Sequence, residues 1–155
     1  MYSALPILTS LIGLGGFIVG VYSFASPVSA AQIYGMQLGK ASIKSKKSMD
    51  ESTSAEDIYR HMAYTGVRNL VVGSTILALT WYWQYGTHAT MDKVTVQRCL
   101  GIVITTGSLT PVVDAIVTWQ GALQGVDAAI GKRAALLHAT RSIFWLAGGL
   151  WCLLG

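Results

Sequence analysis

Four apolar stretches, each about as long as a bilayer is thick, dominate this chain of 155 residues. A transmembrane helix needs about 20 predominantly apolar residues, and the four stretches cover residues 5–24, 62–83, 99–119 and 134–154. Only 12% of the residues are charged, against roughly 25% in soluble domains. The sequence therefore predicts an all-α fold, a polytopic membrane four-helix bundle that forms a single domain.

The segments between the spans differ in character. Residues 40–57 hold four lysines, then four acidic residues, among several serines. A segment with so few apolar residues cannot form a hydrophobic core, so we expect a polar loop. Residues 27–38 are predicted to form a short interfacial helix that begins at Pro27. In the third span Pro111 removes an amide donor, which predicts a kink beside Asp114 or a purely architectural bend.

The basic residues predict the orientation in the membrane. The first and third loops carry seven Lys and Arg residues, whereas the opposite side carries only Lys93 and Arg98. By the positive-inside rule these two loops are cytosolic and both termini are lumenal, so we expect a multi-pass protein of the endoplasmic reticulum. No basic stripe is interleaved with aromatic residues, as a nucleic-acid-binding surface would require. The expected partner is therefore membrane lipid and not nucleic acid.

Four ionisable residues lie inside the apolar stretches: Arg68, Asp114, His138 and Arg141. A charge at the bilayer centre costs at least ~2.5–3.5 kcal/mol on insertion scales, so such residues are usually paired and functional. Counting a rise of about 1.5 Å per residue from the nearest loop places all four roughly 7–12 Å below the cytosolic surface. We therefore expect them to converge in one site.

Other polar residues are predicted at a similar depth. Tyr64 precedes Arg68 by one turn, so the two should share a helix face. Asn69, Tyr22 and His61 are candidate substrate-binding residues, with His61 at the rim of the second span.

The residue types in this cluster suit acid–base chemistry. Asp114 beside arginines is expected to stay ionised and to act as a general base or a nucleophile. Arg68 and Arg141 would stabilise a developing oxyanion, and His138 or Tyr64 would protonate a leaving oxygen. The set suits addition of water, or of an internal hydroxyl, to an epoxide on a lipophilic small molecule. It equally suits proton-transfer isomerisation of a lipophilic carbonyl compound.

Metal and cofactor chemistry is not expected. The His and Asp residues lack metal-ligand spacing, and Cys99 and Cys152 lack it too, although a disulfide between them stays open. The chain has neither a phosphate-binding glycine loop nor a serine nucleophile elbow. We therefore predict no metal and no cofactor.

A non-catalytic alternative remains open. Asp114 could pair with Arg68 or Arg141 and hold together a small transporter or scaffold, since buried charges are usually paired. Four helices form only a small conduit, so such a transporter would need to be a homo-oligomer. One carboxylate does not neutralise two arginines, however, and this surplus of positive charge favours a pocket.

Three short motifs resemble a family of small four-helix membrane proteins from bacteria and fungi whose function is unknown. The motifs are GVRNL at 66–70, LTPVVDA at 109–115 and LHAT at 137–140, and SPVSAA at 26–31 followed by YG at 34–35 is similar to the segment after the family's first helix. The resemblance covers most of the chain except the polar loop. Family members usually have Gly-x-Arg-Asp where this chain has Asn69, so a second carboxylate is missing here.

The resemblance implies that Arg68, Asp114 and His138 are the site. Some fungal relatives lie in polyketide or meroterpenoid pathways, where small membrane proteins open or cyclise epoxides. By analogy, it implies an enzyme of natural-product biosynthesis.

Overall fold

The computed structural model describes residues 4–34, 48–86, 90–124 and 128–155. All regular secondary structure in these residues is helical, which confirms the predicted all-α class. In chain order the elements are α1 (Ala4–Ala25), α2 (Pro27–Ile33), α3 (Ser48–Trp81), the π-helix η1 (Tyr82–Gly86), α4 (Thr90–Gly107), α5 (Leu109–Gln124) and α6 (Ala128–Leu154).

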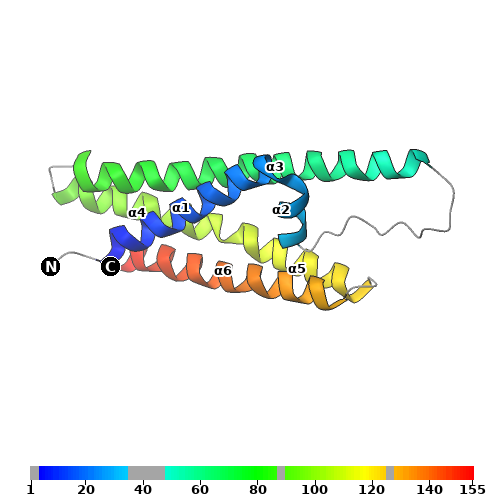
Figure 1. Ribbon diagram of the computed structural model, residues 1–155. Coiled ribbons are helices and arrows are strands. Elements are labelled where there is room, and N and C mark those ends of the chain that lie inside the picture. Colours follow the sequence, from blue (N-terminus) through cyan, green and yellow to red (C-terminus); the bar gives the residue numbers. More distant parts are fainter. Residues whose placement is uncertain (1–3, 35–47, 87–89, 125–127) are drawn as a thin grey trace.

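Four helical bodies run along one long axis: α1, α3, α4 followed by α5, and α6 (Figure 1). The α1 helix packs mainly against α3, whereas α6 packs against both α4 and α5. The start of α1 and the end of α6 lie at the same end of the bundle, and the start of α3 projects beyond the opposite end (Figure 1). The predicted four-helix bundle is therefore present.

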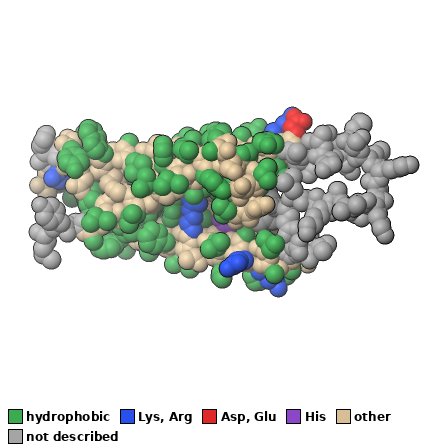
Figure 2. Space-filling view, in the orientation of Figure 1, with side chains coloured by type: hydrophobic (Ala, Val, Ile, Leu, Met, Phe, Trp, Pro, Cys, Tyr) green, Lys and Arg blue, Asp and Glu red, His purple; other side chains and the backbone are tan. Residues whose placement is uncertain are grey.

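Three helical segments are long and apolar enough to cross a membrane: Ala4–Ala25, Glu56–Gly86 and Thr90–Leu123. The fourth predicted span, 134–154, is helical throughout but is not one of these three. Its outer face is nevertheless apolar, because Leu136 and Ile143 are 66% and 69% exposed. Large apolar side chains also cover much of the face in Figure 2, as expected for a protein surrounded by lipid.

Close backbone contact joins α1 to α3. A Cβ atom at Gly16 would lie 3.3 Å from the Gly73 Cα, and one at Gly20 would lie 3.0 Å from the Gly66 carbonyl oxygen. Small residues are needed where two helix backbones approach this closely. The Gly16-x-x-x-Gly20 motif therefore packs on α3.

The predicted polar loop 40–57 is wrong in its second half, because α3 begins at Ser48. Residues 48–57 contain no Gly or Pro, so no helix-breaking residue type interrupts this stretch. Residues 40–47 lie outside the described part of the chain.

The short helix predicted from Pro27 is α2, with the proline in its first turn; residues 35–38 of the prediction lie outside the described residues. Its Ala30 and Ala31 are buried and belong to a cluster with Ile58 and Met62 of α3. The α2 helix is therefore packed on the bundle through its alanines.

The third predicted span is interrupted one turn before Pro111. The α4 helix ends at Gly107 and α5 begins at Leu109. Ser108 bridges the break, with its backbone N–H donating to the Ile104 carbonyl at 2.9 Å and its hydroxyl donating to the Thr105 carbonyl at 2.6 Å. The break sits where a proline deprives the Gly107 carbonyl of its partner.

The apolar core lies in the half of the bundle that holds the described chain ends. It consists of buried side chains from α1, α3, α4 and α6: Leu5, Ile12, Ile76, Leu100, Ile104, Trp145 and Cys152. Cys152 is buried and Cys99 is exposed, and both thiols are free.

Candidate functional site

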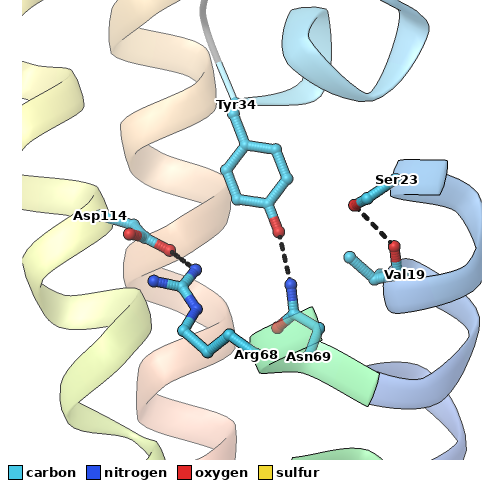
Figure 3. Close-up of polar contacts among 6 residues, drawn as sticks. All are labelled: Val19, Ser23, Tyr34, Arg68, Asn69 and Asp114. Carbon is cyan, nitrogen blue, oxygen red and sulfur yellow. Dashed lines mark hydrogen bonds and ion pairs between the residues drawn. The ribbon is translucent and has the colours of Figure 1, made fainter. Parts of the chain in front are cut away.

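An ion pair links α3 to α5 inside the bundle. The Arg68 Nη2 donates to the Asp114 Oδ2 at 3.0 Å, and the two side chains are 38% and 22% exposed. Figure 3 shows the guanidinium of Arg68 reaching across to the carboxylate of Asp114. The pair therefore joins residues 46 positions apart in the sequence.

A second polar contact brings α2 to the same place. The amide Nδ2 of Asn69 donates to the Tyr34 hydroxyl at 3.0 Å (Figure 3). The Tyr34 ring in turn lies against the ring of His138, with centroids 4.9 Å apart. Residues of α3, α6 and the end of α2 thus form one continuous polar cluster.

His138 is the most deeply buried titratable residue of this cluster, at 5% exposure. Its Nε2 is buried and has no hydrogen-bond partner in the described residues, and the same holds for the Nε of Arg68. Asp114, Arg141 and Arg68 lie close enough to act electrostatically on His138. Buried polar atoms normally have partners, and two of the three buried side-chain N or O atoms without a partner in the described residues belong to this cluster.

Arg141 connects two cavities. The first has a volume of about 10 Å³ and is lined by Arg68, Asn69 and Asp114 together with Arg141, which is the least volume that holds one water. The second has a volume of about 110 Å³ and lies between α1, α2 and α6. Arg141 lines both.

The second cavity is lined by both polar and apolar side chains. Tyr34, His138 and Arg141 supply the polar groups, with Tyr22 and Ser23 of α1 also in the lining. The hydroxyl of Ser23 donates to the Val19 carbonyl at 2.9 Å (Figure 3), so it is already used within α1. Tyr22, predicted to bind substrate, does line this cavity.

Two predicted site residues lie elsewhere. Tyr64 is 77% exposed, His61 is exposed too, and neither lines the two cavities. Tyr64 and Arg68 are four residues apart on α3, but only the long Arg68 side chain extends inward to α5. The predicted acid role of Tyr64 and binding role of His61 are therefore not supported by their positions.

Sequence reasoning missed Tyr34 and Trp145. Tyr34 was noted only as part of a motif after the first helix. It directly follows the last residue of α2, and its ring lies against the ring of His138. The Trp145 ring lies 5.2 Å from the Arg141 Cζ in a cation–π contact. The spacing of Arg141 and Trp145 on one helix face was the available signal for this second contact.

No group of three His, Cys, Asp or Glu side chains that could hold a metal ion occurs in the described residues. The polar cluster holds one carboxylate, one imidazole, two guanidinium groups and one phenol. Such a set can move protons and bind an oxyanion.

Comparison with known proteins identifies the family. The family described as Domain of unknown function (DUF4267) matches residues 13–152, and the chain belongs to it. No curated protein and no solved structure matches the chain. The matched range includes every residue of the polar cluster.

Proposed function

We propose that this member of the family is a membrane-embedded enzyme that opens an epoxide, with water or an internal hydroxyl as nucleophile, on an apolar polyketide or terpenoid. The observation that carries the proposal is the pair of cavities that share Arg141. One is of water size and is lined by Asp114, and the other is larger and is lined by His138. This arrangement suits a nucleophile on one side and an apolar substrate on the other.

The proposed roles follow from the positions of the side chains. Asp114, oriented by Arg68 at 3.0 Å, accepts the proton of water or of the substrate hydroxyl. The nucleophile's oxygen forms a bond to one epoxide carbon, the C–O bond of that carbon breaks, and its electron pair stays on the epoxide oxygen. Arg141 stabilises the resulting negative charge.

The epoxide oxygen then takes a proton from His138 or Tyr34. Tyr34 replaces Tyr64 in this role because its hydroxyl already accepts a hydrogen bond from Asn69, which leaves the phenol proton for a ligand. Protonation completes an alcohol; Asp114 then gives its proton to solvent, and the deprotonated His138 or Tyr34 takes one from solvent, so no net proton is released.

A membrane location supports this proposal, since an apolar substrate partitions into the bilayer. We place the protein in the endoplasmic reticulum with lumenal termini and cytosolic first and third loops. The uneven distribution of basic residues supports that orientation.

The test uses membranes that carry the protein, a panel of epoxide-bearing polyketides and terpenoids, and ¹⁸O-labelled water, with mass spectrometry of the products. Label in the product indicates hydrolysis, and an unlabelled isomer indicates cyclisation or isomerisation. Asp114→Asn should lower turnover by about 10²–10⁴-fold, the usual contribution of a general base. Asp57→Asn is the matched control, because Asp57 is exposed on the same bundle. Full turnover in Asp114→Asn would disprove the assigned base.

One specific observation favours the alternative of a non-catalytic transporter or scaffold. Arg68 is paired with Asp114 and Arg141 lies over Trp145, so each arginine already has a favourable contact. In that case Asp114→Asn lowers stability and no substrate in the panel is converted.

A further inference from the structure

The larger cavity opens at the side of the bundle. Its rim residues Tyr22, Ile33 and Leu137, which come from α1, α2 and α6, are 38%, 52% and 60% exposed. In Figure 2 basic and histidine side chains are visible in the middle of a face that is otherwise largely apolar. A ligand therefore reaches the cavity from the surrounding lipid, with its polar end first.

The charges around the two cavities do not balance. Their lining contains the cations Arg68 and Arg141 and a single anion, Asp114. Asp114 is hydrogen-bonded to Arg68, whereas the one partner that the structure gives Arg141 among the described residues is the Trp145 ring. The guanidinium of Arg141 thus keeps its N–H donors for another acceptor, and a charge in an apolar setting needs a counter-ion.

A second polar side chain lines the same space. His138 belongs to the cavity lining and is only 5% exposed, while its Nε2 is buried without a partner in the described residues. Both His138 and Arg141 lie on α6 three residues apart, so they share one face. Together they contribute two polar side chains to a cavity whose lining also includes the apolar Val19, Ala30, Ile33 and Leu137.

We propose that the cavity between α1, α2 and α6 binds the ionised head of a long-chain carboxylate, with Arg141 as its counter-ion and His138 as a second polar contact. The chain of the ligand extends past Tyr22 and Leu137 into the lipid. A carboxylate on Arg141 occupies the group that the proposed reaction assigns to the epoxide oxygen, so this inference goes beyond the proposed function: such a ligand competes with the epoxide substrate, and its binding is measured without turnover.

The cavity favours a carboxylate over a phospholipid phosphate. A planar carboxylate matches the two parallel N–H donors of a guanidinium, and a phosphate can form the same pair of hydrogen bonds. A diester phosphate, however, carries substituents on two sides, whereas a carboxylate carries a single chain. Apolar walls on the remaining sides suit a single hydrocarbon chain.

The test measures binding of a radiolabelled long-chain fatty acid and of the primary alcohol of equal length, with the full-length protein in neutral detergent at about pH 8, where an aqueous carboxylic acid is ionised. We expect the acid to bind at least about tenfold more tightly than the alcohol, the effect of one modest charge-assisted contact. Arg141→Gln should remove this preference. Arg133→Gln, which removes the same charge from an exposed position on α6, should retain it.

Arg141→Lys keeps the charge but loses the planar fork, so part of the preference should remain. If Arg141→Gln does not fold, two measurements still test whether Arg141 binds the carboxylate: the preference of Arg141→Lys and the comparison of acid and alcohol on the unmodified protein. Equal binding of acid and alcohol by the unmodified protein would overturn the inference. A preference that survives Arg141→Gln, or that Arg133→Gln abolishes, would overturn it too.

A competitor separates the two sources of an anionic head. Phosphatidylcholine with added phosphatidylglycerol, whose anionic head is a phosphate diester, should in mixed micelles with the same detergent displace the fatty acid no better than phosphatidylcholine alone. Displacement by phosphatidylglycerol as effective as by unlabelled fatty acid would contradict a carboxylate site. A clear preference for the acid without conversion of any epoxide would contradict the proposed reaction and leave the binding inference standing.

Discussion

The two halves of this bundle differ in the side chains that fill their interiors. In the half with the described chain ends, buried apolar side chains form one cluster. In the other half the interior holds an ion pair, two unpartnered buried nitrogens and two cavities. Glycines bring α1 and α3 into backbone contact from Gly16 at Gly73 to Gly20 at Gly66. Burial of apolar side chains offsets the cost of the polar groups, which by themselves lower stability.

The comparison leads to a division of roles. Packing of α1 on α3, the most extensive helix contact in the described residues, is expected to stabilise the fold, and the polar half is where we propose ligand binding and chemistry. Substitutions in the first half should therefore change unfolding, while those in the second should change binding or turnover more than unfolding.

The largest effect is expected at Gly73. A Cβ atom there would meet the backbone of Phe17 and would lie 2.8 Å from the Gly13 carbonyl oxygen, and backbone atoms do not move aside cheaply. Gly73→Ala should lower the free energy of unfolding by about 3 kcal/mol, the upper end for overpacking, as measured by thermal unfolding in detergent. Gly15→Ala, with nothing within 4 Å, is the control and should be neutral or stabilising by up to about 1 kcal/mol. Equal melting temperatures for Gly73→Ala and Gly15→Ala would contradict the view that close packing of α1 on α3 stabilises the fold.

A double-mutant cycle of Arg68→Gln and Asp114→Asn tests the polar half. The coupling energy should be about 1–2 kcal/mol, because the hydrogen bond is charge-assisted but both side chains are partly exposed. Chemical or thermal unfolding of the four proteins gives this value. A coupling as large as the Gly73 effect would instead assign the ion pair a main part in stability.

Tyr34→Phe should affect stability less and function more. It removes the acceptor that the Asn69 amide uses at 3.0 Å, which costs about 1 kcal/mol. If Tyr34 donates the proton to the epoxide oxygen, turnover should fall by about 10²-fold. Turnover equal to that of the unmodified enzyme would leave His138 as the acid.

The smallest effects are expected at Tyr64 and His61. Both are exposed outside the cavities, so Tyr64→Phe and His61→Gln should change the free energy of unfolding by less than about 0.5 kcal/mol. Turnover in the epoxide assay should be unchanged. A loss of turnover in either variant would mean that the site extends beyond the cluster described above.

The sequence predicted the helical class because hydropathy and length suffice to locate apolar helices. It also indicated where polar residues would gather, since Arg68, Asp114 and Arg141, on three different spans, were counted to similar depths from the first and third loops. The structure places all three around one small cavity. Their chemical roles are still predictions.

Side-chain direction was harder to predict. The four-residue spacing of Tyr64 and Arg68 suggested a shared inward face, yet Tyr64 is exposed. The Arg68 side chain reaches the interior all the same, because a long arginine can extend inward from the edge of a helix. Tyr34 was overlooked because its position depends on how α2 packs against α3 and α6, which no local pattern encodes. The break at Ser108 was predictable from Pro111, although its exact residue was not.

A charge exchange tests the central claim most directly. In the double variant Arg68→Asp with Asp114→Arg, a cation and an anion again face each other, whereas the single variants leave like charges together. We expect the melting temperature to recover from the single variants toward that of the unmodified protein, while epoxide turnover stays absent because the carboxylate has moved. Recovery of turnover together with stability would show that the pair is a structural link between α3 and α5, and would contradict the assignment of Asp114 as the catalytic base.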